Sequence, residues 1–256
     1  MRTLLVALTM ILITPPCAIA VLVGAFLKVP DEPGSIFWRV PRFWSKAVLW
    51  AAGVDVRVHG AEQILTPPAS CVYASNHVSW FDVFSIASVL PRYSFVAKAE
   101  LLRIPIFGVG AKAVGTVPIE RANQKAAFAS YEQAAQVIRE GRSVVVFPEG
   151  TRGRSYALRS FKKGPFVLAI SAAAPIVPIF VHGTMDVQPK GAWRIRPGKV
   201  DLHFLPPVST KGLEYEDRDR VSALVRTRLA ELMEREYGLR EPAAEVAEGN
   251  PAASLN

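Results

Sequence analysis

Short runs of β-branched and aromatic residues alternate with longer helical stretches from residue 50 onward, and this alternation is typical of an α/β layer structure. Strands are expected at 54–58, 71–75, 94–97, 113–119, 143–147, 176–181 and 199–205. Helices are expected at 79–89, with Ser79 as the N-cap, and at 124–139, 164–173 and 216–237. We therefore predict one domain at 51–238, with a mixed, mostly parallel central sheet flanked by helices, and a disordered tail at 239–256.

The N-terminal segment 1–50 is predicted to associate with a membrane. Residues 3–27 form an uncharged run of 25 residues, long enough by count to cross a bilayer. The pair Pro15-Pro16 divides this run, and a helix of about 12 residues rises only about 18 Å, short of the roughly 30 Å hydrocarbon core. A kinked span and a hairpin within one leaflet both remain open. A cleaved signal peptide is the third interpretation, because Arg2 gives a positive start and Ala18-Ile19-Ala20 is similar to a cleavage site.

Basic residues follow the apolar run more than they precede it. Only Arg2 comes before the run, whereas the flank after it holds Lys28, Arg39, Arg42 and Lys46. Positively charged flanks tend to stay in the cytoplasm. The predicted location is thus the inner or plasma membrane, with the following domain on the cytoplasmic side.

Composition narrows the partners of this chain. Half of its residues are hydrophobic, its formal net charge is +8 and its pI is near 9.7, so anionic partners are favoured. Membrane lipids and phosphate-bearing substrates fit this charge. Nucleic acid also carries negative charge, but it is not expected as a partner, because the sequence has no zinc finger, aromatic RNA-binding signature or dense basic tract. The two cysteines, Cys17 and Cys71, predict neither a disulfide framework nor a zinc site.

The motif NHVSWFD at 76–82 carries the clearest chemistry. On one continuous helix, five residues would separate His77 from Asp82 by about 140°, so contact requires a loop at His77 and a helix that begins near Ser79. With that break, Asp82 accepts a hydrogen bond from one imidazole nitrogen and leaves the other as a general base. The competing use is a metal site, but His59, His182 and His203 show no ligand spacing. No metal ion and no cofactor are expected.

The nucleophile for such a base is expected to come from the substrate. The chain has no Gly-x-Ser-x-Gly motif, and neither cysteine lies in a polar stretch of sequence. A substrate hydroxyl can take the place of a catalytic serine, lose its proton to His77 and attack a thioester directly.

Three further motifs accompany this pair: GTVPIER at 115–121, FPEGTR at 147–152 and VPI at 177–179. At these intervals, over about residues 50–210, the chain resembles the glycerolipid acyltransferase family, which includes the 1-acyl-glycerol-3-phosphate acyltransferases. The first and third of that family's four blocks are complete here. The resemblance implies a glycerol-3-phosphate acyltransferase-like fold and the direct attack described above.

The resemblance also implies a set of substrate-binding residues. A guanidinium at Arg152 is expected to bind the acceptor's phosphate, because Gly150 permits a tight turn that exposes Thr151 and Arg152 at the sheet's carboxyl edge. Without the motif match, Arg152 would be one solvated cation among several. Lys98 and Arg121 are expected to complete the anion pocket. Glu149 is expected either to orient Arg152 or to hold a substrate hydroxyl, and Pro178 is given a structural role.

The implied reaction moves a fatty acyl group from acyl-CoA or acyl carrier protein to the free hydroxyl of a lyso-phospholipid acceptor, 1-acyl-glycerol 3-phosphate, which yields phosphatidic acid. Two alternatives remain open. One is an acyltransferase that uses another lyso-lipid, such as lyso-ornithine lipid. The other is a non-catalytic protein that binds anionic lipids through its basic surface and apolar N-terminus.

Overall fold

The computed structural model of the 256-residue chain describes residues 1–32, 34–64, 69–119 and 124–240. Most of the tail predicted to be disordered, from residue 241 on, lies outside the described residues. The division into segments at 50 and 238 stays a prediction.

A seven-stranded sheet forms the centre, in the order β1-β7-β6-β2-β5-β3-β4. Five of its six strand pairs are parallel and one, β6 with β7, is antiparallel, which confirms the mixed, mostly parallel sheet that the alternating pattern predicts. The strands are β1 Val54–His59, β2 Val72–Ser75, β3 Tyr93–Lys98, β4 Val117–Ile119, β5 Ser143–Val146, β6 Ile176–His182 and β7 Gly198–Phe204.

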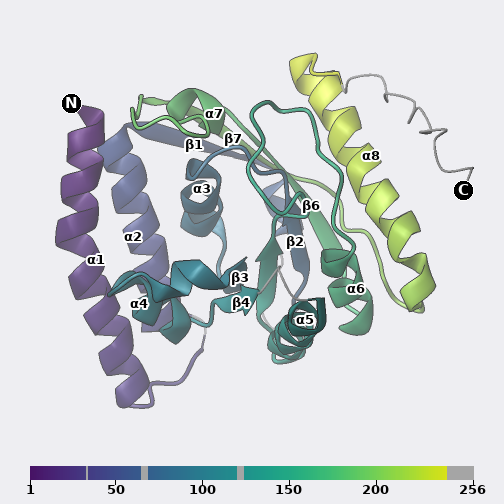
Figure 1. The fold of residues 1–256 in the computed structure, drawn as a ribbon, viewed down its shortest axis with the longest axis horizontal. Helices are drawn as coiled ribbons and strands as arrows, with labels where there is room; N and C mark the ends of the chain where they lie inside the picture. Colours follow the sequence, from purple (N-terminus) through teal and green to yellow (C-terminus); the bar gives the residue numbers. More distant parts are fainter. Residues whose placement is uncertain (33, 65–68, 120–123, 241–256) are drawn as a thin grey trace, which may run out of the picture.

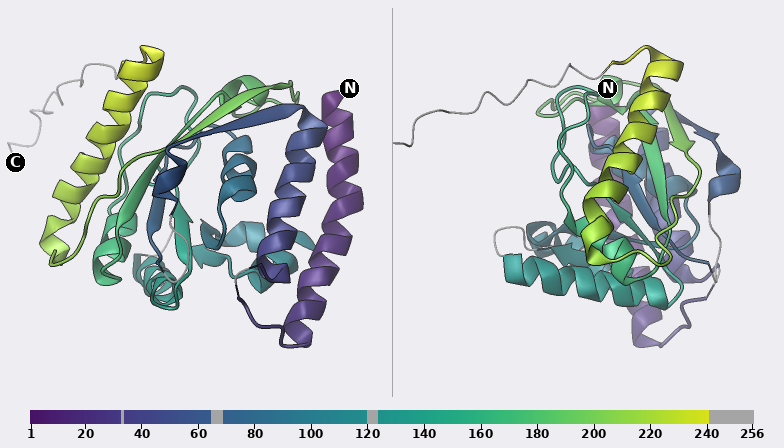
Figure 2. Two further views of the ribbon diagram at one scale, coloured as in Figure 1. Left: turned by 180° about the vertical axis from the view of Figure 1, so that it is seen from behind. Right: turned by 90° about the vertical axis from the view of Figure 1, so that its right-hand side faces the viewer.

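Helices cover both faces of this sheet (Figure 1). The pair α1 and α2 lies on one side of the sheet and α8 on the opposite side, as the view from behind also shows (Figure 2). The helices are α1 Arg2–Phe26, α2 Ile36–Ala52, α3 Phe81–Val89, α4 Phe107–Ala113, α5 Gln124–Arg139, α6 Gly164–Ser171, α7 Thr184–Val187 and α8 Arg218–Tyr237. Short 3₁₀ turns lie at Ala61–Gln63, Ala99–Arg103 and Tyr215–Asp217.

Alternation along the central strands produces the two cores. In β5, Val144 and Val146 belong to the core cluster that contains side chains of α5, α6 and α8, whereas Val145 belongs to the cluster that contains α2 and α3. All three valines are at most 2 % exposed. Successive side chains of a strand point to opposite faces, so a strand buried on both faces is a continuous apolar run. This explains why SVVV reads as a central strand.

The apolar run at the N-terminus forms one helix rather than two halves. Pro15 and Pro16 both lie inside α1, each without a backbone N–H to donate, yet the helix continues on both sides of them. Its 25 residues rise about 37 Å. It is the one helix in the described part of the chain that is long and apolar enough to cross a membrane, a property that suggests membrane association.

The outer face of α1 is exposed and apolar. Val6, Ala18 and Val21 are buried against the rest of the protein. The large side chains that remain exposed along this helix are Leu4, Leu8, Ile11, Leu12, Ile19, Leu22, Val23 and Phe26.

A cluster of charges holds the loop between α1 and α2 to the sheet. The Asp31 carboxylate accepts hydrogen bonds from Arg92 (3.0 Å) and Arg142, and Trp38 Nε1 donates to its other oxygen at 2.8 Å. Arg92 ends the approach to β3, and Arg142 directly precedes β5. The α1–α2 pair is therefore attached to the two strands through a shared, half-buried carboxylate.

Two sequence-based boundaries are wrong. The strand expected at 113–119 is shorter, because Ala113 ends α4 and only Val117–Ile119 forms β4. Ser79 is not the N-cap of α3, whose N-cap is Trp80. The Ser79 hydroxyl still accepts a hydrogen bond from Phe81 N (3.2 Å) at the start of α3. It also donates a hydrogen bond to Gln188 O (2.7 Å), which joins the start of α3 to the segment after α7.

Candidate active site

The candidate site lies where three neighbouring strands end. In the order β6-β2-β5, the strands are parallel, so their carboxyl ends meet at one edge of the sheet, the usual place for ligands in α/β proteins. His77 follows β2, Glu149 follows β5 and Thr184 follows β6. Residues far apart in the sequence are thus brought together by strand order alone.

His77 and Asp82 are in contact. Nδ1–H of the imidazole donates to Asp82 Oδ2 over 2.8 Å. The His77 side chain is 13 % exposed and that of Asp82 is fully buried. The predicted break is present, because His77 lies in the loop after β2 and Asp82 in the first turn of α3, where the helix dipole stabilises a carboxylate.

The buried carboxylate of Asp82 has three further donors. The backbone N–H groups of Val78 (2.7 Å) and Ser79 (2.9 Å) also reach Oδ2, and the Thr184 hydroxyl reaches Oδ1 at 2.5 Å. Sequence reasoning missed Thr184, which lies outside the four motif blocks. Its position directly after a buried strand, at the carboxyl edge of the sheet, is the signal that points to it.

The other ring nitrogen of His77 is left for chemistry. With Nδ1 donating to Asp82, Nε2 carries the lone pair, and no described residue forms a hydrogen bond with it. One face of the imidazole stacks on Phe147, with ring centroids 4.0 Å apart. The loop is fixed by Asn76, whose side-chain amide exchanges two hydrogen bonds with the backbone of Val181 in β6 (2.7 and 3.0 Å). The imidazole is thus held in position and in tautomer.

The FPEGTR segment makes the expected tight turn after β5. Gly150 has φ 73°, a conformation that favours glycine, and its N–H donates to Phe147 O at 2.9 Å. Thr151 is exposed and Arg152 is half-buried. Gly153 N donates to His77 O at 2.7 Å, so the turn packs directly against the histidine loop.

Glu149 contacts the histidine loop rather than Arg152. Its Oε1 accepts a hydrogen bond from His77 N (2.9 Å) and its Oε2 one from Arg159 N (3.4 Å). Burial raises the pKa of Glu149 to about 7, and the charge of Asp82 adds to this, while the two N–H donors and Arg159 act against it. The carboxyl group therefore changes charge near neutral pH, next to the candidate base.

Arg152 lies over an aromatic ring beside the site. Its guanidinium carbon is 4.7 Å from the centroid of the Trp80 ring, and its carbonyl accepts a hydrogen bond from Lys190 Nζ at 2.8 Å. Partial burial lowers the pKa of Arg152, and the charge of Asp82 partly offsets this. The Arg152 guanidinium thus interacts electrostatically with Asp82 and is held by stacking on Trp80.

Of the two further residues predicted for the anion pocket, the structure describes only Lys98, and it forms no hydrogen bond or ion pair with the described residues around His77. Lys98 ends β3 and pairs with Glu100 at 3.0 Å, with both side chains 55 % exposed. Arg121 lies outside the described residues. Among the residues that are described, no group of three or more His, Cys, Asp or Glu side chains is suited to hold a metal ion.

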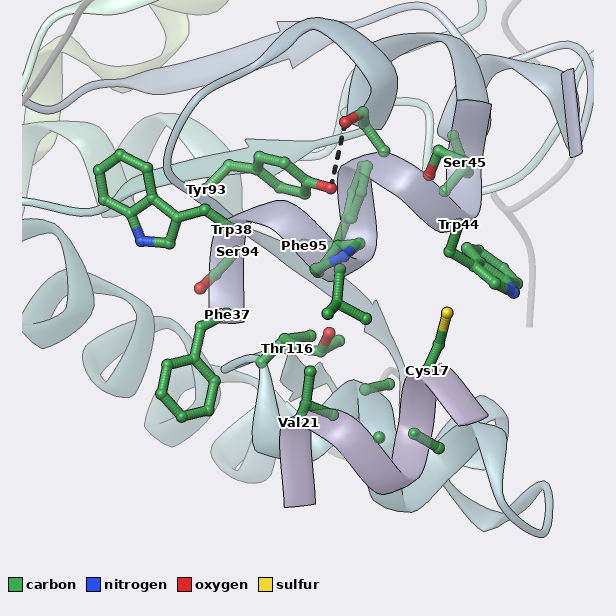
Figure 3. A pocket seen from close by; sticks show the side chains of 18 of the residues that line it. Cys17, Val21, Phe37, Trp38, Trp44, Ser45, Tyr93, Ser94, Phe95 and Thr116 are labelled. Carbon is green, nitrogen blue, oxygen red and sulfur yellow. Dashed lines mark hydrogen bonds between the residues drawn. The ribbon is translucent and has the colours of Figure 1, made fainter. Parts of the chain in front are cut away.

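An apolar cavity of about 140 Å³ lies among α1, α2, α4 and β3 (Figure 3), and His77, Asp82 and Arg152 do not line it. Side chains of α1 and α2 form one wall, including Cys17, Val21 and Trp44, and Tyr93 and Phe95 of β3 lie opposite. Two aromatic rings lie between the cavity and the imidazole. The Phe95 ring, which lines the cavity, stacks on Phe147 with centroids 6.3 Å apart, and Phe147 stacks on His77. The Arg92 and Arg142 side chains of the Asp31 cluster also line the cavity.

The fold and site define a class of α/β proteins with a histidine–carboxylate pair at the carboxyl edge of a mostly parallel sheet, near an arginine. Residues 55–182, half of the chain, match the family model described as Acyltransferase. The chain belongs to this acyltransferase family.

Relatives and a solved structure agree with this assignment. The chain is 36 % identical over 165 residues to a 1-acyl-sn-glycerol-3-phosphate acyltransferase of Limnanthes douglasii, which covers 64 % of this chain and 58 % of that protein. It is 35 % identical over 190 residues to the alpha form from Ovis aries, 73 % of this chain and 66 % of that one. The chain thus spans less than two thirds of the length of these relatives.

The crystal structure of the 1-acyl-sn-glycerophosphate (LPA) acyltransferase PlsC from Thermotoga maritima is similar throughout. Its TM-score is 0.75 at 28 % sequence identity, and the match covers 90 % of this chain and 94 % of that one. Because 90 % of this chain is covered, the match includes part of the segment before residue 55, where the family model begins.

The pKa of Glu149 predicts how stability depends on pH. A carboxyl group whose pKa rises from 4.5 to about 7 on folding binds its proton more tightly in the folded protein. Its contribution is complete below about pH 4.5 and is lost as the pH rises through about 7. Relative to Glu149→Gln, the wild-type free energy of unfolding should fall by about 3 kcal/mol between pH 4.5 and 8.

Chemical denaturation at a series of pH values measures this difference. Glu216→Gln, which alters an exposed carboxylate with no ion pair among the described residues, is the matched control and should follow the wild-type pH dependence. Parallel curves for wild type and Glu149→Gln would contradict the raised pKa.

Proposed function

We propose that this protein is a 1-acylglycerol-3-phosphate O-acyltransferase. It moves a fatty acyl group from a thioester donor to the free hydroxyl of 1-acyl-glycerol 3-phosphate and produces phosphatidic acid. The observation that carries this proposal is the hydrogen bond from His77 Nδ1 to the buried carboxylate of Asp82, with Nε2 left unbonded among the described residues. The names of the relatives and of the similar crystal structure support the acceptor.

In the proposed reaction, the acceptor supplies the nucleophile. His77 Nε2 takes the proton of the acceptor's hydroxyl as its oxygen attacks the thioester carbonyl carbon. The tetrahedral intermediate collapses with cleavage of the carbon–sulfur bond, and the imidazolium returns its proton to the leaving thiolate. One ester forms, one thioester breaks and the base is regenerated, so no covalent enzyme intermediate is needed.

Asp82 stabilises the imidazolium that forms in this step. Its charge is fixed at Oδ2 by three donors, one of them the ring that becomes positive. A buried ion pair interacts more strongly than one in water, and because these donors are already in place, little reorganisation accompanies the proton transfer. Glu149, bonded to the backbone N–H of His77, supports the same loop from the other side.

Arg152 is proposed to bind the acceptor's phosphate. Its guanidinium stacks on Trp80 and interacts electrostatically with Asp82, and Thr151 in the neighbouring turn is exposed. A guanidinium can bind a phosphate with two parallel hydrogen bonds. Lys98 and Arg121 remain proposed contributors to this anion site.

The apolar cavity is proposed to receive a fatty acyl chain. Its walls are mostly apolar, and two stacked rings, Phe95 and Phe147, separate it from the imidazole. The donor is acyl-CoA or acyl carrier protein, both of which present the same thioester.

The protein is proposed to act at a membrane, because the proposed acceptor, 1-acyl-glycerol 3-phosphate, and the product, phosphatidic acid, are membrane lipids. Support comes from α1, whose outer face is apolar along its length, and from Lys28, Arg39, Arg42 and Lys46 after it. Basic flanks favour the cytoplasmic side of the inner or plasma membrane for the rest of the chain.

Removing the base should abolish acyl transfer. His77→Ala is expected to lower turnover at least about a hundredfold with folding retained, because a general base contributes on this scale. The measurement is formation of labelled phosphatidic acid from a labelled acyl thioester, resolved by thin-layer chromatography. His59→Ala is the control. His59 lies on the edge strand β1, where it is hydrogen-bonded to Asp201 and takes no part in the candidate site.

The same assay separates the alternatives. Near-normal turnover of His77→Ala would falsify the mechanism. Transfer to lyso-ornithine lipid but not to 1-acyl-glycerol 3-phosphate would replace the proposed acceptor, and binding of anionic lipid without any transfer would favour a non-catalytic protein.

Removing the guanidinium should weaken use of phosphate-bearing acceptors. Arg152→Ala is expected to raise the acceptor KM roughly 30-fold, which corresponds to about 2 kcal/mol for a charged hydrogen-bonded contact. Arg154→Ala, two residues on and exposed, should leave KM unchanged. An unaltered acceptor KM in Arg152→Ala would contradict phosphate binding by Arg152 and indicate a solvated cation.

Charging the outer face of α1 should release the protein from lipid. Ile11 and Leu12 are 67 % and 70 % exposed, and the double variant Ile11→Glu/Leu12→Glu places two carboxylates at the middle of the helix. Co-sedimentation with anionic vesicles should fall at least about tenfold, because each charge in the hydrocarbon region costs about 2 kcal/mol or more. Leu224→Glu on α8 is the control.

Equal sedimentation of the double variant and wild type would assign α1 to ordinary packing. A mature N-terminus near Val21, found by mass spectrometry, would support export of a cleaved protein instead.

A further inference from the structure

The two oxygens of the Asp82 carboxylate are held unequally. Oδ2 accepts from His77 Nδ1 and from the backbone N–H groups of Val78 and Ser79. Oδ1 accepts from the Thr184 hydroxyl at 2.5 Å, and this is its one donor among the described residues. Both side chains are fully buried, so water does not replace that hydroxyl.

Thr184 itself is held by its neighbours along the chain. Gly183 has φ 88°, and a Cβ at this position would lie 2.1 Å from Lys199 O, so only glycine fits. The Tyr156 hydroxyl accepts hydrogen bonds from Gly183 N (2.7 Å) and Met185 N (3.5 Å), the backbone groups on either side of Thr184. The hydroxyl of Thr184 is therefore presented from a fixed backbone.

We propose that Thr184 is a positioning residue that acts through Asp82 and sets the orientation of the His77 imidazole. A carboxylate turns about its Cβ–Cγ bond, and the bond at Oδ1 stops this rotation, so that Oδ2 stays directed at Nδ1. Without that donor, one oxygen of a buried anion has no partner, and the carboxylate rotates to share its donors. The imidazole then loses its alignment with the acceptor's hydroxyl.

This role connects β6 to the base. His77 and Asp82 come from the segment after β2, whereas Thr184 comes from the segment after β6, a neighbouring strand. Tyr156, in the segment between β5 and α6, completes the support. The inference rests on the proposed function of the His77–Asp82 pair.

Two substitutions separate the hydrogen bond from packing. Thr184→Val keeps the shape of the side chain and removes the hydroxyl, whereas Thr184→Ser keeps the hydroxyl and removes the methyl group. Thr184→Val is expected to lower kcat about 10- to 100-fold with both substrate KM values unchanged, the scale of one hydrogen bond to a charged group. Thr184→Ser should recover most of the wild-type kcat.

A double variant tests whether the effect passes through Asp82. In an Asp82→Asn background, the further loss of kcat on Thr184→Val should be less than about threefold, because residues that act as one unit are not additive. Thermal unfolding of each variant in detergent verifies that a cooperative fold is retained. Tyr156→Phe, which removes the support for Gly183 and Met185, should lower kcat in the same direction and less.

The outcomes distinguish this inference from the proposed function. If the wild type transfers no acyl group, the proposed function fails and the role of Thr184 fails with it. If the wild type is active, His77→Ala is inactive and Thr184→Val matches the wild type, only the inference fails. Equal losses in Thr184→Val and Thr184→Ser, or a raised KM at unchanged kcat, would also overturn it, because they indicate packing or a substrate contact.

Discussion

A single buried carboxylate organises the site. Asp82 has no exposed surface, and the cost of burying its charge is offset only because donors arrive from two segments: the loop after β2 and the start of α7 after β6. Each of these segments has its course fixed by the parallel strand that precedes it. The geometry of the histidine is therefore a consequence of sheet order, and a local change in either segment would remove donors from a buried anion.

The elements that the sequence predicted well are those that depend on local pattern. The runs VYAS and SVVV are recognisable as buried strands, and the sharp turn at Gly150 follows from the residue type. The angle between His77 and Asp82 on a helix predicts the loop-to-helix break that their contact requires. Together these account for the sheet and for the core of the candidate site.

The contacts that the sequence could not predict are those made between distant segments. Asn76 bonds to Val181 and Thr184 to Asp82, across sequence separations of 105 and 102 residues. No spacing rule links such positions before the strand order is known.

Tertiary packing also explains the boundary errors. Pro15 and Pro16 predict a break by local rules, but α1 is packed along α2, and Trp44 Nε1 donates to the Thr14 hydroxyl at 3.0 Å, directly before the two prolines. In the 113–119 region, helix α4 packs against α1 and includes Ala113, the first residue of the run expected to form a strand. Glu149 illustrates the same limit for chemistry. Its neighbours in sequence suggest a partner for Arg152, whereas burial and the N–H of His77 determine both its contacts and its pKa.

One helix, α1, has two faces with different surroundings. Cys17, Ala18 and Val21 face the cavity, while Ile11, Leu12 and Ile19 face outward. Since the wall is a single helix thick, lateral pressure on its outer surface is transmitted to the cavity without an intervening layer. We therefore expect the width of that internal space to respond to whatever contacts the outer face of α1.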